Sequence, residues 1–147
     1  MPFHRLTVKF AGPLLAFALT VLLAASANAG GRLELTFGSD KAEIELNDSA
    51  AARDLLSMLP LTLAFEDYNN TEKIAYPPRK LSAKGAPASF DPSKGDFALY
   101  APWGNLVIYY RDFTDSPGLV PLGRVTSGLD KLAAMSGKFS ATARAVK

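Results

Sequence analysis

Apolar and polar residues alternate along much of the chain after residue 30, and short breaks separate the alternating runs. A period of two is typical of strands that bury one face in a core. Two further runs are rich in aromatic and β-branched residues, which also favour strands. The expected strands are residues 33–37, 42–46, 61–68, 97–99, 106–110, 122–125 and 139–145.

Two segments have helical signals instead. Residues 47–49 are good N-cap residues ahead of leucines at helical spacing, and Pro60 is expected to end that helix. Ser127, with Asp130 three residues later, resembles a capping box and predicts a second, shorter helix. This mainly β pattern predicts a closed or nearly closed antiparallel barrel with two short helices, because closure removes exposed strand edges.

Residues 69–92 interrupt the strand pattern. The segment contains Gly85 and four prolines, which are Pro77, Pro78, Pro87 and Pro92. Such a concentration of residues that break regular structure predicts a long loop, either ordered or functional.

The first 29 residues have the layout of a secretory signal peptide. Basic residues precede an apolar run at 10–25, and Ala27-Asn28-Ala29 is a cleavage site of the A-x-A type. A retained anchor is the alternative, but this run is short for a membrane-spanning helix, which needs about 20 apolar residues. We therefore predict a periplasmic or secreted protein, with residues 1–29 removed and residues 30–147 forming one domain.

Cleavage changes the charge balance, because Arg5 and Lys9 are removed and 14 basic residues remain against 14 acidic ones. A neutral domain without a basic cluster lacks the electrostatic features of nucleic-acid binding and of binding to an anionic membrane. Neither partner is expected after cleavage. The chain has no cysteine, so disulfides and a lipid-modified cysteine are excluded.

The only histidine, His4, leaves with the signal peptide. The mature chain therefore cannot use a Ser-His-Asp or Cys-His nucleophile, a Cys/His zinc site or imidazole proton transfer. An oxygen-only metal site near Glu66 and Glu72 would lack calcium-loop spacing. We expect no metal and no cofactor, and the pattern identifies no catalytic residue.

The densest cluster of aromatic and amide side chains consists of Tyr100, Trp103, Asn105 and either Tyr109 or Tyr110. Aromatic faces beside an amide favour the floor of a pocket for a peptide or small molecule. In the alternative interpretation, Trp103 plugs one end of the barrel and Asn105 closes a turn.

A second group stands at the start of the long loop. Asp67, Tyr68 and Glu72 are candidate ligand-binding residues there, together with Arg111 further along the chain. Two carboxylates beside one cleft, including Glu66, could act as general acid and base, whereas the alternative is that they are solvated residues of a turn. Which of the arginines, Arg79, Arg111 or Arg124, lines a cleft stays open.

Several blocks resemble one protein family over about residues 33–146. They are Leu59-Pro60-Leu61-Thr62-Leu63, Glu66-Asp67-Tyr68-Asn69, Thr71-Glu72-Lys73, Gly95-Asp96, Tyr100-Ala101-Pro102-Trp103-Gly104-Asn105-Leu106, Leu122-Gly123-Arg124 and Ser127-Gly128-Leu129. With these blocks the chain resembles the bacterial cyclophilin-like domain proteins, a family largely of unknown function. The resemblance implies a small eight-stranded barrel of the cyclophilin type, capped by helices.

The resemblance does not extend to the proline pocket of true cyclophilins. These carry an Arg followed closely by Phe-x-Met-x-Gln, and no such series stands in this sequence. We predict an exported cyclophilin-like domain that binds a peptide or small ligand in a cleft between the long loop and the Trp103 turn. The alternatives are a peptidyl-prolyl isomerase, by fold analogy alone, and a structural interaction module. The oligomeric state is not predicted.

Overall fold

The computed structural model describes residues 30–147, and the predicted signal peptide lies outside the described residues. The long strands are β1 (Gly31–Phe37), β2 (Asp40–Leu46), β3 (Leu61–Tyr68), β4 (Glu72–Ala75), β6 (Asp96–Tyr100), β7 (Asn105–Tyr109), β9 (Leu119–Ser127) and β10 (Phe139–Val146). Two short strands, β5 (Ser89–Phe90) and β8 (Ser116–Pro117), pair separately, and the helices are α1 (Ala50–Met58) and α2 (Leu129–Ala134).

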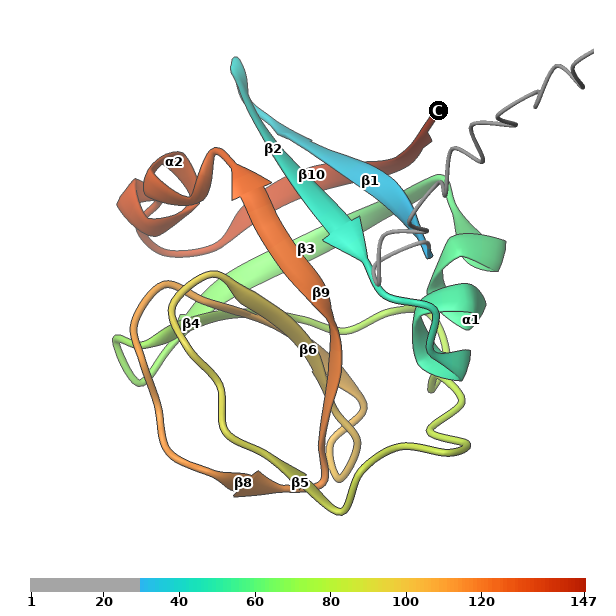
Figure 1. Ribbon diagram of the computed structural model, residues 1–147. Coiled ribbons are helices and arrows are strands. Elements are labelled where there is room, and N and C mark those ends of the chain that lie inside the picture. Colours follow the sequence, from blue (N-terminus) through green and yellow to red (C-terminus); the bar gives the residue numbers. More distant parts are fainter. Residues whose placement is uncertain (1–29) are drawn as a thin grey trace, which may run out of the picture.

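The eight long strands of the described part close into an antiparallel barrel in the order β1-β10-β3-β4-β7-β6-β9-β2 (Figure 1). The predicted mainly β, eight-stranded barrel with two helices is thus confirmed. The two helices lie at opposite ends of β2, with α1 following its last residue and Gly128, just before α2, packed against Lys41 near its start. No helix within residues 30–147 has the length and apolar character needed to cross a bilayer.

Most strands bury one face, as the alternation predicts. In β1, Leu33, Leu35 and Phe37 point into the barrel and are at most 2% exposed. The strands β6 and β7 differ, because both of their faces are buried. The inward residues of β7 belong to the barrel core, while Val107 and Tyr109 belong to a second apolar cluster. The barrel therefore carries a second, smaller core on its outer surface.

The prediction of an unbroken loop at residues 69–92 is wrong at both ends. The strand β4 pairs with β3 and β7 inside the barrel, and β5 pairs with β8. The turn from β3 to β4 is tight because Asn69 and Asn70 both have positive φ, 52° and 49°. Asparagine tolerates this left-handed conformation, which a type I′ turn requires at both of its central residues. The longest part of this segment without strand or helix is residues 76–88.

The helix starts were predicted with mixed success. Ser49 caps α1 as expected, since its hydroxyl accepts a hydrogen bond of 3.1 Å from the Ala52 amide. The capping box at Ser127 is wrong, because Ser127 is the last residue of β9 and Gly128 is the N-cap of α2. Gly128 has a φ of 82°, and a Cβ there would lie 2.2 Å from the Lys41 carbonyl oxygen. β9 is also longer than predicted, and β8 was not predicted.

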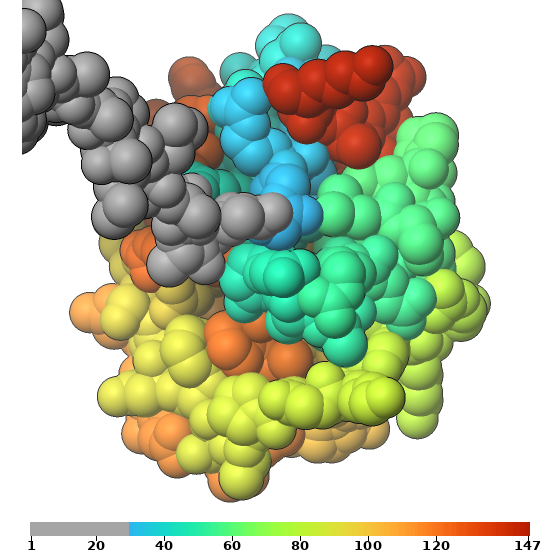
Figure 2. Space-filling model, turned by 45° about the vertical axis from the view of Figure 1, so that its right-hand side comes forward, coloured from blue at the N-terminus to red at the C-terminus, as the bar shows by residue number. Residues whose placement is uncertain are grey.

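Residues 76–88 are held against α1. The Arg79 guanidinium donates two hydrogen bonds to the Asp54 carboxylate, at 2.9 and 2.7 Å, and the Ser82 amide donates a third at 2.8 Å. The Arg79 hydrogen bond, with the Ser82 amide second, lowers the pKa of Asp54 to about 2. Figure 2 shows this yellow-green segment running along the surface beside α1. The segment thus covers the α1 side of the barrel.

Candidate functional site

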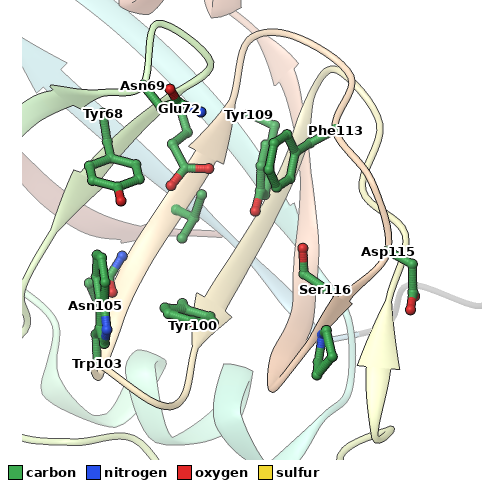
Figure 3. A pocket seen from close by; sticks show the side chains of 12 residues that line it. Tyr68, Asn69, Glu72, Tyr100, Trp103, Asn105, Tyr109, Phe113, Asp115 and Ser116 are labelled. Atoms are coloured by element: carbon green, nitrogen blue, oxygen red, sulfur yellow. The ribbon is translucent and has the colours of Figure 1, made fainter.

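A cleft of about 330 Å³ lies on the outer surface of the barrel, over β4, β7 and β6 (Figure 3). Its floor follows from strand register, because outward-facing residues alternate along each strand. Asn105, Val107 and Tyr109 are the outward residues of β7. Glu72 of β4 pairs directly with Tyr109, and Tyr100 of β6 pairs with Asn105. Three neighbouring strands therefore place their side chains on one patch.

The walls of the cleft come from turns. The end of β3 contributes Tyr68, the β3–β4 turn contributes Asn69, and the β6–β7 turn contributes Trp103. Residues 113–117, which include β8, form the opposite wall. Of residues 69–92, which were expected to form one wall of a cleft, only Asn69 and Glu72 line this one.

Five aromatic rings surround the cleft in two groups. The Trp103 ring meets the Tyr68 ring at 5.6 Å and the Tyr100 ring at 5.4 Å, both edge to face. On the other side, Tyr109 and Phe113 stack with their centroids 6.3 Å apart. Figure 3 shows the Glu72 carboxylate pointing into the space between Tyr68 and Tyr109. The carboxylate thus lies between the two groups of rings.

The large apolar side chains that the described residues leave exposed gather at this cleft. Trp103 is 48% exposed, Tyr68 43% and Phe113 42%, and only Tyr76 of this class lies elsewhere. The interpretation of Trp103 as a plug of the barrel is therefore wrong. Exposed aromatic residues on one patch are typical of an interaction site.

Asn105 is a buried polar residue of the floor, with 1% of its surface exposed. Its Nδ2 donates a hydrogen bond of 3.3 Å to the Leu106 carbonyl. Its Oδ1 is buried, and no donor in residues 30–147 reaches it. A buried acceptor without a donor costs about 1–3 kcal/mol, so native proteins seldom retain one.

Glu72 is the half-buried carboxylate of the cleft. Burial is the main cause that raises its pKa, and the negative charge of Asp67 adds to this, while the neighbouring Tyr109 hydroxyl acts in the opposite direction. Burial, followed by the charge of Glu72, raises the pKa of Tyr109. The cleft therefore contains a carboxylate whose charge is poorly compensated. The part of the chain that the structure describes contains no group of three His, Cys, Asp or Glu residues able to hold a metal ion.

Comparison with known proteins gives the family. A model of the cyclophilin-like family matches residues 35–144. The chain belongs to the cyclophilin-like family. The solution structure of the hypothetical protein AF2241 from Archaeoglobus fulgidus is similar to this cyclophilin-like chain, with a TM-score of 0.61 and 16% identity over 83% of this chain and 99% of that one. At this identity the likeness concerns the fold alone. No curated protein matches the sequence.

The structure of this cyclophilin-like domain places six of the eight candidate residues around one cleft. They are Tyr68, Glu72, Tyr100, Trp103, Asn105 and Tyr109. Asp67 and Arg111 lie at a separate depression beside Lys73 and Met135. Asp67 accepts hydrogen bonds there from Lys73 and from the Tyr110 hydroxyl. These two candidates are therefore not brought together with the other six.

The other two candidate arginines form ion pairs away from the cleft, Arg79 with Asp54 and Arg124 with Asp96.

Sequence reasoning missed the other half of the lining, which comprises Asn69, Val107, Phe113, Asp115, Ser116 and Pro117. A signal for Val107 was present, because an uninterrupted apolar run such as residues 106–109 is typical of a strand buried on both faces. The cyclophilin-like barrel therefore has a covered outer surface at β7.

Proposed function

We propose that this cyclophilin-like domain binds a small molecule or a peptide side chain in the cleft over β4, β7 and β6. The observation that carries the proposal is the arrangement of five aromatic rings around a concave site that also holds a carboxylate and a buried amide. Largely apolar concave sites with a few polar groups are typical of ligand-binding pockets.

Trp103 supplies a direct test, because it is the only tryptophan of the chain and stands at the rim of the cleft. We expect a ligand that enters the cleft to change the Trp103 fluorescence in a saturable manner. Small-molecule and short-peptide libraries can be screened in this way. If no compound changes the emission at millimolar concentration, the proposed binding function is wrong.

A matched pair of variants locates the binding. Tyr68→Ala removes an exposed ring that contacts Trp103, whereas Tyr76→Ala removes a somewhat more exposed ring outside the cleft. We expect Tyr68→Ala to weaken binding roughly fivefold, the size of one aromatic contact. Tyr76→Ala and Arg111→Ala should leave the affinity unchanged. Equal losses for Tyr68→Ala and Tyr76→Ala would contradict binding at this cleft.

We propose that this binding takes place outside the cytoplasm, in the periplasm or the medium. The support is the predicted signal peptide, with its apolar run and the site Ala27-Asn28-Ala29. N-terminal sequencing of the protein recovered from the exported fraction should begin at Gly30. A chain that is found only in the cytoplasm, or that still begins at Met1, would disprove export with cleavage.

A further inference from the structure

We infer that the ligand of this cleft carries a protonated amine. The inference rests on the proposed binding function and specifies the chemical class that the site would select. Three features of the described lining carry it: the ring surfaces, the half-buried carboxylate of Glu72 and the absence of lining cations.

The ring surfaces favour a cation. The face of a tyrosine or tryptophan ring is negative, and a cation within about 6 Å of the ring centroid is attracted to it. Rings stand on both sides of the cleft, with Tyr68 and Trp103 in one group and Tyr109 and Phe113 in the other. An ammonium group between these groups could lie near more than one ring face.

The polar groups of the cleft have the complementary charge. Glu72 projects from the floor toward the rings, whereas Asp115 belongs to the opposite wall and its carboxylate is directed away from Glu72. The Asn105 amide carries no net charge, and its nitrogen donates to the Leu106 carbonyl. Among residues 30–147, the side chains that line the cleft include no lysine, arginine or histidine. An anionic ligand would therefore meet the negative charge of Glu72 and no ion-pair partner.

The environment of Glu72 supports the same choice. Burial raises the pKa of Glu72, and the nearby charge of Asp67 raises it further. A bound ammonium ion would stabilise the ionised carboxylate and so lower this pKa again. A neutral ligand that only displaces water would raise it. The direction of the change on binding thus distinguishes the two classes.

The test uses three probes of one shape: cyclohexylmethylammonium, cyclohexylmethanol and cyclohexanecarboxylate. Binding to the mature chain is followed by Trp103 fluorescence and by NMR titration. We expect the ammonium probe to bind at least roughly tenfold more tightly than the alcohol, and the carboxylate to bind more weakly than either. An alcohol or a carboxylate that binds as well as the ammonium ion overturns the inference but leaves the cleft a binding site. If none of the three probes binds, the inference of an amine ligand is wrong. The proposed binding function is then judged separately, by the library screen.

Glu72→Gln is the decisive variant, and Glu66→Gln is its control, because Glu66 lies outside this cleft beside Lys138. We expect Glu72→Gln to reduce ammonium binding about tenfold while alcohol binding stays the same. Glu66→Gln should change neither. Unchanged ammonium binding in Glu72→Gln would contradict the role of this carboxylate.

The pH dependence gives a second measure. Tyr109 and Asp67 act directly on Glu72, Tyr110 also lies within reach of its charge, and both tyrosines stay neutral below about pH 10. Ammonium affinity should fall as the pH is lowered through the raised pKa of Glu72, and Glu72→Gln should remove most of that dependence. The unliganded Glu72→Gln variant should also be more stable than the wild type at pH 7 but not at acid pH. The reason is that a raised pKa in the folded state means that ionised Glu72 costs stability.

Discussion

Replacing Gly123 by alanine is expected to destabilise the barrel by about 3 kcal/mol, the upper end of the range for overpacking. Gly123 belongs to β9 and pairs with Leu46 of β2 and with Phe97 of β6. A Cβ at this position would lie 2.0 Å from the Glu45 carbonyl oxygen and 2.9 Å from the Leu46 Cα. Both atoms belong to the backbone, so no side-chain rotation relieves the contact. The strands must separate where β2 and β9 meet in the closed barrel.

Urea unfolding, followed by far-UV circular dichroism, measures this loss, and Gly85→Ala is the matched control. Gly85 has a φ of 73°, and a Cβ there would meet no atom within 4 Å in the part of the chain that the structure describes. Its replacement should cost about 1 kcal/mol, the penalty of a left-handed backbone alone. If Gly123→Ala is no more destabilising than Gly85→Ala, the close packing of β2 on β9 is not as described.

The parts of the fold that the sequence predicted well are those with one buried face. In β1, β3 and β10 the alternation of side chains follows directly from exposure to water on one side, so a period of two is visible in the sequence. Where both faces are buried, the alternation disappears. The run at residues 106–110 was correctly expected to be a strand, but its pattern carried no information on what covers the outer face. The second core was therefore missed.

The strand β4 was missed for a different reason. It has only four residues, and its apolar part, Ile74 and Ala75, stands between an Asn-Asn turn and a proline-rich segment. Its place in the barrel depends on pairing with β7, whose nearest paired residue is about 30 positions away. The pattern of apolar residues within a short segment carries no information about such long-range strand pairing.

The candidate site was predicted where it depends on neighbours in sequence. Trp103 lies in the turn between β6 and β7, and Tyr100 and Asn105 flank that turn, so the proximity of the three residues follows from chain connectivity. Asp67 and Tyr68 are also adjacent, yet adjacent strand residues face opposite sides of a sheet. Tyr68 pairs with Glu72 and lines the cleft, whereas Asp67 pairs with Lys73 and points away from it. Asp67 was therefore grouped wrongly with the cleft, because residues adjacent in a strand lie on opposite faces of the sheet.

Replacing Asp67 by alanine is expected to destabilise the domain by about 3 kcal/mol, since it removes the charged partner of a buried lysine. The Lys73 side chain is only 2% exposed, and its ammonium group donates hydrogen bonds to Asp67 at 3.0 Å and to the Met135 carbonyl at 2.6 Å. It also lies 5.1 Å from the centroid of the Tyr110 ring. Without Asp67, the Lys73 ammonium group would contact only the Met135 carbonyl and the Tyr110 ring. We place the loss at the lower end of the range for broken buried pairs because the Asp67 side chain is 35% exposed.

Lys73→Met should be less destabilising than Asp67→Ala, although it removes the same ion pair. Methionine retains most of the buried stem without a charge, and Asp67 keeps the Tyr110 hydroxyl and contact with water. The pH dependence gives an independent measure. The Tyr110 hydrogen bond, more than Lys73, lowers the pKa of Asp67, so its stabilisation is complete above the unfolded pKa of about 4 and is lost as the pH falls through the lower folded value. In urea unfolding, the difference between wild type and Asp67→Ala should therefore shrink in acid. If Lys73→Met is as costly as Asp67→Ala, or if the difference is constant with pH, the stability comes from packing of the lysine stem instead of from its charge.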